Sequence, residues 1–446
     1  MIPDAIRELF ARLDAAGIGY VVLRGYLPLD ELGESLDIDV YIAPRDRPRA
    51  TETLAGVGWL ARRYQTGRYP HRFYDSFEVP GRVCTMLDVV YGLYYGDRLH
   101  GLAGAERVLA TSEPLDGVRV PHPWVALLTF ALHVALDKGT LSEPNARRGQ
   151  LLWDACARRP EEAALVQREF GAAARALAER FGRWVGGAEP ANGEELRREA
   201  VALECLRPRP VLARVHALWV RLSRRMMRPL RVAVLGMDGA GKTTLIDYAV
   251  SLPSPLPMGS AYLGNNHYLT RTFRWLLARI EALQASGRGD GLRVKLLDKG
   301  RALWWPLELH ARMRKAERAR ALVFYDRYPF PRYERDDQPT TLPGHVMAAY
   351  EWLWTALLPR AHVLLFLDGA PEVIWARKRE YPFEAFQQAR ARYLRLVEEF
   401  PGERHVVATD GPLEVSKANV VEALRTSSAL RRQLYRDSFA SRSVGT

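Results

Sequence analysis

Hydrophobic and polar positions follow both helical and strand periods over the first hundred residues. Apolar side chains at helical spacing predict a helix over residues 5–16, and short apolar runs predict strands at 19–25, 36–43 and 83–95. The order of these elements predicts a small α/β domain over residues 1–105.

The pattern changes in the middle of the chain. Residues 106–228 form long segments rich in Ala, Leu and Arg at helical spacing, which predict a helical region. Its last segment carries an apolar stripe beside cations, namely Val215, Leu218, Trp219 and Leu222 with Arg214, Arg221, Arg224 and Arg225. Such a helix either links two domains with its stripe packed or lies on an anionic membrane, and packing is the commoner arrangement.

From residue 229 onward, buried strands alternate with helices. Apolar runs at 231–236, 321–326 and 363–369 are each followed by helical or polar segments. This alternation is typical of a parallel sheet with crossover helices and predicts a third domain at residues 229–446.

Length and composition fit this division. A chain of 446 residues with 48% hydrophobic content exceeds one hydrophobic core and predicts two or three soluble domains. The net charge of +12 suits polyanionic partners, although a basic genomic bias would produce the same value. Nucleic acid is a weak candidate because the cations are dispersed and none of the usual binding motifs occurs.

Cysteine usage and hydropathy suggest a location. Cys84, Cys156 and Cys205 are far apart and form neither a disulfide framework nor a zinc-type cluster. We find neither a signal peptide nor an apolar stretch long enough to span a membrane. We therefore expect a cytoplasmic protein, with peripheral membrane contact and oligomerisation left open.

One motif carries specific chemistry. The segment GMDGAGKT, residues 236–243, satisfies the P-loop pattern, follows an apolar strand and opens a helix. Glycines let backbone N–H groups converge on phosphate oxygens, while the lysine reaches the β and γ phosphates and the hydroxyl can ligate Mg²⁺. The predicted nucleotide-binding residues are Gly236, Asp238, Gly239, Gly241, Lys242, Thr243 and Thr244, with ATP and Mg²⁺ as cofactors.

Two later segments discriminate among P-loop proteins. Asp326 and Arg327 end a predicted strand, where an open α/β sheet places its ligand crevice, although a buried ion pair is the alternative. After the strand at 363–369, a helix leads into Arg377 and Arg379, which could close over a triphosphate or could be an exposed basic face. We predict that Lys242 and these four residues take part in catalysis.

The segments GMDGAGKTT, FYDRY and LFLDGAPEVIWARKRE together resemble thymidylate kinase and its relatives among the nucleoside-monophosphate kinases, over roughly residues 230–425. The resemblance implies a P-loop NTPase fold, a three-layer α/β/α kinase domain with a lid. It also implies that Lys242 and Thr243 hold the donor phosphates and metal, that Asp238 and Arg327 face the acceptor, and that Arg377 and Arg379 belong to the lid.

The acceptor segments depart from this family. AYLGNNHY (residues 261–268) replaces a stretch rich in Arg, Glu, Pro and Gly, and PFPRYERDDQPTT (329–341) replaces a Ser-rich segment. The looser thymidylate-kinase-like proteins of bacterial surface-polysaccharide pathways look closer. The acceptor is therefore expected to be a nucleoside monophosphate or a related small molecule.

The first domain offers a second candidate site. Asp37 and Asp39 share one face of a predicted strand, and Asp88 lies on another strand, so the three could hold Mg²⁺. With the preceding Gly25, this pattern resembles the nucleotidyltransferase superfamily over residues 5–100, although Tyr26 stands where that pattern has a small residue. The alternative is a solvated strand face.

Three hypotheses follow. The first is ATP- and Mg²⁺-dependent phosphoryl transfer by the C-terminal domain. The second is nucleotidyl transfer to a small molecule, sugar or protein by the N-terminal domain. The third is a non-catalytic, nucleotide-gated binding protein.

Overall fold

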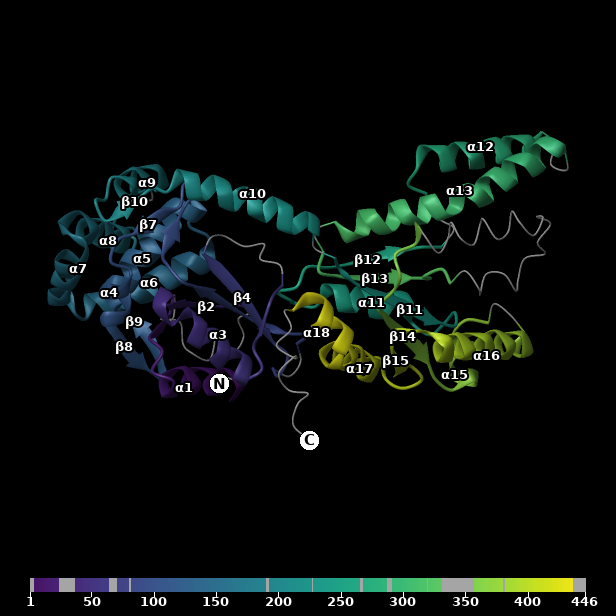
Figure 1. The fold of residues 1–446 in the computed structure, drawn as a ribbon, viewed down its shortest axis with the longest axis horizontal. Helices are drawn as coiled ribbons and strands as arrows, with labels where there is room; N and C mark the ends of the chain where they lie inside the picture. Colours follow the sequence, from purple (N-terminus) through teal and green to yellow (C-terminus); the bar gives the residue numbers. More distant parts are fainter. Residues whose placement is uncertain are drawn as a thin grey trace. The chain divides into compact units, whose positions relative to one another are not determined.

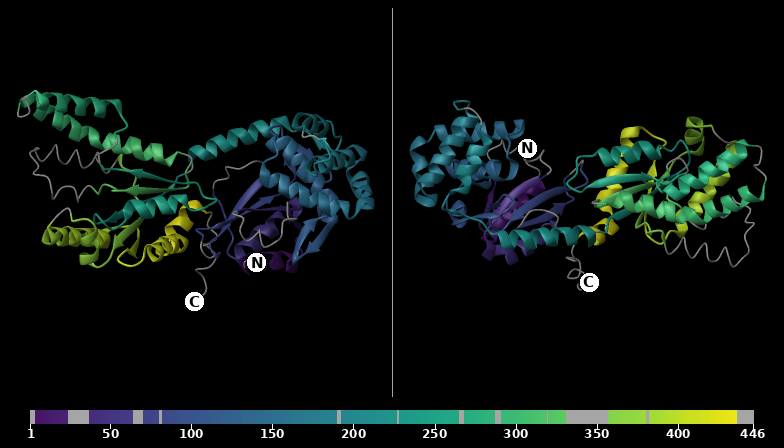
Figure 2. Two further views of the ribbon diagram at one scale, coloured as in Figure 1. Left: turned by 180° about the vertical axis from the view of Figure 1, so that it is seen from behind. Right: turned by 90° about the horizontal axis from the view of Figure 1, so that it is seen from above.

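The computed structural model describes residues 4–23, 37–63, 70–79, 82–189, 192–226, 228–264, 268–286, 291–318, 320–330, 357–379 and 382–435. Figures 1 and 2 show the ribbon. Contacts divide the chain into two compact units. Unit 1 comprises Met1–Pro80, Cys84–Met226 and Tyr435–Thr446, and unit 2 comprises Gly81–Val83 and Met227–Leu434.

Unit 1 is built on a mixed five-stranded sheet with the order β1-β2-β5-β4-β3. Its strands are β1 (Tyr20–Val22), β2 (Asp37–Ile42), β3 (Leu60–Ala61), β4 (His71–Ser76) and β5 (Thr85–Val90). β2 and β5 are parallel and the other pairs are antiparallel. The predicted strands around Tyr20, Asp37 and Thr85 are thus confirmed, whereas Gly25 and Tyr26 lie outside the described residues.

Each face of this sheet is covered by its own core. One face packs against α1 (Asp4–Ala15) and α3 (Arg47–Gly56), which follows η1 (Pro44–Asp46). The other face contributes Val21, Tyr41 and Val90 to the core formed by the helical region. The α/β and helical regions therefore share one core within unit 1.

The helical region is arranged around α5 (Pro123–His133), nearly all of which is buried. It continues as the π-helix η2 (Val134–Lys138), followed by α6 (Glu143–Ala157), η3 (Pro160–Glu162), α7 (Ala163–Phe170), α8 (Ala172–Val185), α9 (Gly193–Val201) and α10 (Pro210–Met226). Small elements precede or interrupt it, namely β6 (Tyr94–Tyr95), β7 (His100–Leu102), α4 (Glu106–Ala110), β8 (Ser112–Leu115), β9 (Val118–Pro121) and β10 (Leu206–Arg207). The strands β8, β9 and β10 thus lie inside residues 106–228, for which only helices were predicted.

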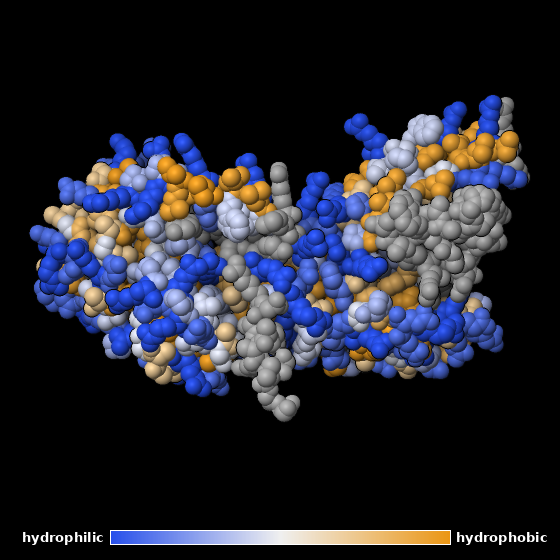
Figure 3. Space-filling model, in the orientation of Figure 1, coloured by the Kyte–Doolittle hydropathy of each residue, from blue (hydrophilic) through white to orange (hydrophobic). Residues whose placement is uncertain are grey.

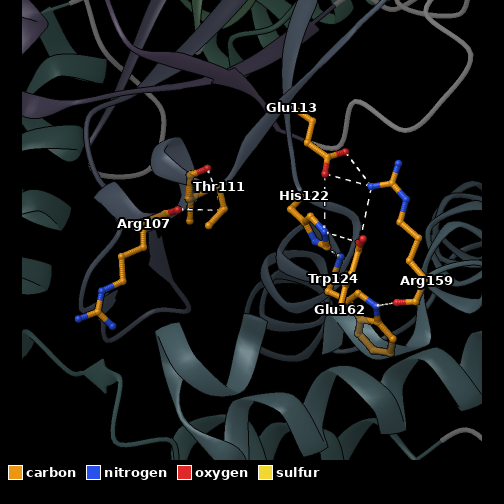
Figure 4. A network of polar contacts seen from close by, with 8 residues as sticks. Arg107, Thr111, Glu113, His122, Trp124, Arg159 and Glu162 are labelled. Carbon is orange, nitrogen blue, oxygen red and sulfur yellow. Dashed lines mark hydrogen bonds and ion pairs between the residues drawn. The ribbon is translucent and has the colours of Figure 1, made fainter. Parts of the chain in front are cut away.

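A polar network fixes the start of α5 (Figure 4). The His122 Nδ1 accepts a hydrogen bond from the Trp124 backbone N–H at 3.3 Å and so caps the helix. The opposite nitrogen of His122 lies 2.8 Å from a Glu162 carboxylate oxygen, and Arg159 lies 3.0 Å from Glu113. These contacts join the β8–β9 hairpin to the helices that follow.

A second buried cluster lies at β3 and β4. Asp75 is completely buried and accepts hydrogen bonds from Arg62 Nε at 2.6 Å and Arg62 Nη2 at 2.7 Å. The Tyr435 hydroxyl donates a further bond at 2.7 Å. Three donors thus satisfy a carboxylate that has no access to water.

Among the described residues of unit 1, the apolar stripe of α10 is exposed, which differs from the commoner of the two expectations. Val211, Val215, Leu218, Trp219 and Leu222 are 43–72% exposed, and Figure 3 shows the apolar surface over this helix. Among the described residues, no helix is both long enough and apolar enough to cross a membrane.

Unit 2 is a parallel five-stranded sheet with the order β12-β13-β11-β14-β15. Its strands are β11 (Leu230–Gly236), β12 (Met258–Tyr262), β13 (Leu322–Asp326), β14 (Val363–Asp368) and β15 (Glu403–Ala408). The chain starts at the centre, moves to one edge and back, and then continues on the other side. The carboxyl end of β11 is therefore the topological switch point, where such sheets bind ligands.

Helices cover both faces of this sheet, as Figures 1 and 2 show. One face packs on α13 (Leu292–Glu317) and α16 (Phe383–Glu399), through side chains such as Leu309, Met313 and Leu396. On the other side lie α11 (Lys242–Ser251), α17 (Leu413–Thr426) and α18 (Ser428–Leu434). Further helices are α12 (Arg271–Ala285) and α15 (Pro371–Arg377). The three-layer α/β/α architecture predicted from the sequence is confirmed for this unit.

Candidate functional site

The loop at residues 237–241 connects the central strand β11 to α11 at the switch point of the sheet. Its glycines are required by geometry. Gly239 has a φ of +92°, and a Cβ built on it would lie 2.7 Å from the Ile374 carbonyl oxygen. Gly241, with a φ of +83°, is the N-cap residue of α11. A side chain at Gly239 would collide as well as be strained, whereas at Gly241 only the positive φ disfavours a side chain.

Lys242 lies folded over the loop from which it projects. Its ammonium donates to the carbonyl oxygens of Gly236 at 2.8 Å and Met237 at 3.1 Å, and lies 3.4 Å from Asp238 Oδ1. Burial lowers the pKa of Lys242 below its ordinary value, although Asp238 and Asp326 oppose that shift. The cation therefore lies beside the amide-lined turn where an anion is best stabilised.

Thr243, on the first turn of α11, meets the end of β13. Its hydroxyl donates to Asp326 Oδ2 at 3.2 Å. The other carboxylate oxygen of Asp326 is buried and has no hydrogen-bond partner within the described part of the chain. A hydroxyl beside a carboxylate with an unused oxygen is a donor set that suits Mg²⁺. These two residues therefore fit the predicted metal.

Asp238 and Arg327 face each other across the loop, with Arg327 Nη2 3.1 Å from Asp238 Oδ1. Burial alone would raise the pKa of Asp238, but Lys242 and Arg327 together hold it below its ordinary value. Arg327 has a φ of +57°, which is strained for a side chain of this size. Such strain is common at functional sites.

A cavity of about 450 Å³ opens beside the loop. The loop contributes Asp238, the start of α11 contributes Lys242 and the residue after β13 is Arg327, while α16 contributes Phe386, Arg392 and Tyr393. Its volume is in the range of small-molecule sites. Cations and aromatic rings together can hold a charged ligand that contains a flat ring.

The two predicted lid residues, Arg377 and Arg379, have different neighbours in the structure. A Cβ built on Gly239 would lie 3.5 Å from the Cβ atoms of both Arg377 and Lys378, so the end of α15 adjoins the loop. Lys378 also helps to lower the pKa of Asp238. Arg379 instead stacks over Trp375, with its guanidinium carbon 5.1 Å from the ring centroid. Thr244 is exposed on α11.

The sequence analysis missed several residues around this site. Asp368 ends β14 and forms a bidentate ion pair with Arg390 of α16, at 2.8 and 2.6 Å. The end of an apolar strand could have singled out Asp368, since the same signal identified Asp326. Lys378 lies between Arg377 and Arg379 and could have been included with them. The residues of α16, such as Arg390, belong to no motif that would have identified them.

The three N-terminal aspartates line one cavity of about 310 Å³ in unit 1. Asp39 and Asp88 are directly opposite each other on the parallel strands β2 and β5. His71 Nδ1 lies 2.8 Å from both oxygens of Asp88. Within the described ranges, no three His, Cys, Asp or Glu side chains are arranged to hold a metal ion. The Mg²⁺ role of the three aspartates therefore stays a prediction.

Helical residues complete this cavity, among them Thr129, His133, Asp137 and Lys138. His133 Nδ1 lies 2.8 Å from Asp137 Oδ2, and the second oxygen of Asp137 accepts from the Gly96 N–H at 2.8 Å. The cavity therefore combines acidic strands with a histidine held in a fixed orientation.

Comparisons with known proteins give a limited picture. No family model and no curated protein matches the chain. Solved structures that resemble it include a deoxyadenosine kinase from M. mycoides with bound dATP, at 12% identity and a TM-score of 0.29. They also include thymidylate kinases from Ehrlichia chaffeensis, at 13% and 0.29, and from Candida albicans, at 17% and 0.32.

These matches cover 44–47% of this chain and 96–100% of the other chains. At such low TM-scores they carry no argument about activity.

Proposed function

We propose that unit 2 transfers the γ-phosphoryl group of ATP to a small-molecule acceptor. The observation that carries this proposal is the contact between the Thr243 hydroxyl and Asp326, at the mouth of a glycine loop that also holds Lys242. A structural loop would need neither a half-buried lysine folded over it nor a carboxylate oxygen that has no hydrogen-bond partner among the described residues.

The donor side follows from the loop. The backbone N–H groups of residues 237–241 and the α11 N-terminus would hold the β and γ phosphates, to which Lys242 would turn from its present carbonyl partners. Thr243 and Asp326 would hold Mg²⁺, which neutralises charge on the phosphates when bound.

The acceptor side is the 450 Å³ cavity. We propose that Asp238 and Arg327 orient the acceptor there, while Phe386 and Tyr393 contact a flat or apolar part of it. Arg377 and Lys378 would close over the phosphates from the end of α15. A nucleoside monophosphate, or a related molecule of surface-polysaccharide metabolism, fits the motif resemblance and this mixture of cations and rings.

Transfer of label from γ-labelled ATP to a panel of nucleoside monophosphates and sugar derivatives tests the proposal. Lys242→Ala should abolish transfer and leave the circular dichroism spectrum unchanged. Lys295→Ala, which removes an exposed lysine of α13, is the matched control and should retain full activity. Transfer at the wild-type rate by Lys242→Ala would overturn the proposed role of the loop.

Nucleotidyl transfer by unit 1 is the second candidate. It is favoured by the meeting of Asp37, Asp39 and Asp88 in one cavity, while the lack of a metal-holding arrangement within the described residues counts against it. Incorporation of label from α-labelled ATP, lost in Asp37→Asn with Asp39→Asn, would support it. Binding of ATP with no product from either label would instead favour a nucleotide-gated binding protein.

A further inference from the structure

A separate cavity of about 450 Å³ lies in unit 2 beside the edge strand β12 and the C-terminal end of α13. Its lining includes four cationic side chains and no acidic one, the cations being Arg312, Lys315, Arg318 and Arg320. It shares no lining residue with the cavity beside the P-loop. The two cavities are therefore distinct, although Tyr262 and Tyr268 belong to the segment 261–268 that stands where the resembling kinases bind their acceptor.

Arg312 is the buried member of this set, with a side chain that is only 6% exposed. Its Nε donates to Glu308 at 3.2 Å, and its Nη1 donates to the Gly264 carbonyl oxygen at 2.8 Å. Its Nη2 is buried and has no hydrogen-bond partner among the described residues. A buried donor left unsatisfied costs about 1–3 kcal/mol, so its position calls for an acceptor.

Glu308 forms an ion pair with Arg312 but does not line the cavity, so the charges of Lys315, Arg318 and Arg320 are not offset by it. It is completely buried and accepts hydrogen bonds from the backbone N–H groups of Leu269 and Thr270 as well as from Arg312. These donors already occupy its oxygens. The guanidinium is also held by the rings of Tyr268 and Trp305, each with its centroid 5.4 Å away. Arg312 is thus fixed in orientation before any ligand binds.

We propose that this cavity binds a small anionic ligand through a phosphate group. The planar guanidinium of Arg312 would present its free Nη2 to a phosphate oxygen, and the exposed Lys315 and Arg318 would neutralise the remaining charge. A fixed buried cation surrounded by mobile surface cations suits a group with several equivalent oxygens. If the ligand also carries a ring, Tyr262 or Tyr268 would contact that ring.

Pyrophosphate is the probe for this site, titrated calorimetrically into the full chain. Because the P-loop would also bind it, the titration uses Lys242→Ala as the background. This protein should retain one pyrophosphate site. Adding Lys315→Ala and Arg318→Ala should weaken binding roughly tenfold or more, since each removes a charge-assisted contact.

The control variant adds Arg293→Ala and Lys295→Ala to the same background. It removes the same charge from exposed positions of α13 that do not line the cavity. Pyrophosphate affinity should change less than about twofold in this variant. Arg312→Lys, which keeps the charge but loses the planar fork, should also weaken binding while circular dichroism confirms the fold.

Two results would overturn the proposal. One is that Lys242→Ala binds no pyrophosphate. The other is that the cavity variant and the control variant lose affinity equally, which would mean that net charge alone attracts the probe. Neither result depends on whether unit 2 transfers phosphoryl groups, since no turnover is measured.

Discussion

The Thr243 hydroxyl donates to Asp326 Oδ2 at 3.2 Å and so joins two segments that are 83 residues apart. The first residue belongs to the helix after the P-loop, and the second ends the neighbouring strand β13. The contact places a hydroxyl and a carboxylate at the carboxyl edge of the sheet, where the loop amides converge. Both groups are needed there if a metal is to accompany the phosphates.

Asp326→Asn tests this pairing. The amide keeps the size of the side chain but removes the charge, so we expect kcat for phosphoryl transfer to fall by about 10²–10³. The Mg²⁺ concentration for half-maximal activity should rise at the same time. Asp298→Asn, at an exposed position of α13, is the control. An unchanged Mg²⁺ dependence in Asp326→Asn would contradict the assignment.

Gly239→Ala should destabilise unit 2. The substitution places a Cβ 2.7 Å from the Ile374 carbonyl oxygen at a φ of +92°, and the backbone strain alone costs about 1–2 kcal/mol. Gly187→Ala separates strain from collision, because its φ is +76° and nothing lies within 4 Å of the added atom. Hydrogen exchange, measured separately over the two units, should show the larger loss of protection in Gly239→Ala. Equal losses of protection in the two variants would contradict this prediction, because they would mean that the backbone around residue 239 shifts to accommodate the added Cβ.

The buried carboxylate of Asp75 should be important for the stability of unit 1. Asp75→Ala removes the partner of Arg62, whose side chain is only 12% exposed, and should cost about 3–5 kcal/mol of unfolding free energy. Tyr435→Phe removes one hydrogen bond but keeps the edge-on packing on Phe77, whose ring centroid lies 5.7 Å away, and should cost about 1–2 kcal/mol. Urea unfolding measures both, and the prediction fails if Tyr435→Phe is the more damaging variant.

The stability of unit 2 should fall as the pH decreases from about 6.5 to about 4. Burial and the nearby Arg231 lower the pKa of His362 from 6.5 to about 4, while Glu317 opposes the shift. His362 Nδ1 accepts from the Arg231 backbone N–H at 3.0 Å, which requires that nitrogen to be unprotonated. Since the unfolded chain binds the proton first, acid favours unfolding across this interval.

His362→Asn keeps an acceptor without a titrating ring and should flatten the pH dependence in that window. Urea unfolding at pH 7 and pH 5 provides the comparison. Glu403 does not affect this comparison. Its pKa is lowered to about 2, so the stability that it contributes is lost only as the pH falls below its ordinary pKa of 4.5. A pH dependence that persists unchanged in His362→Asn would assign it to other groups.

Some parts of the site could be predicted because their signals are local. The P-loop is one, since its glycines and lysine satisfy backbone and phosphate geometry within eight residues. Strand alternation likewise placed Asp37 and Asp39 on one face of β2. The pairing of Asp39 with Asp88 could not be predicted, because it depends on which strand lies beside β2 and in which register.

The sequence by itself determined the two α/β regions, the P-loop, the strand that ends at Asp326 and the basic character of the segment after β14. Only the tertiary structure decided that α16 lines the cavity beside the loop, that the stripe of α10 is exposed and that a buried Arg312 nitrogen has no hydrogen-bond partner among the described residues. The reason is physical. A motif is determined by the backbone conformation of its own few residues, whereas the burial of a side chain and its hydrogen-bond partners depend on residues that the fold brings from distant segments.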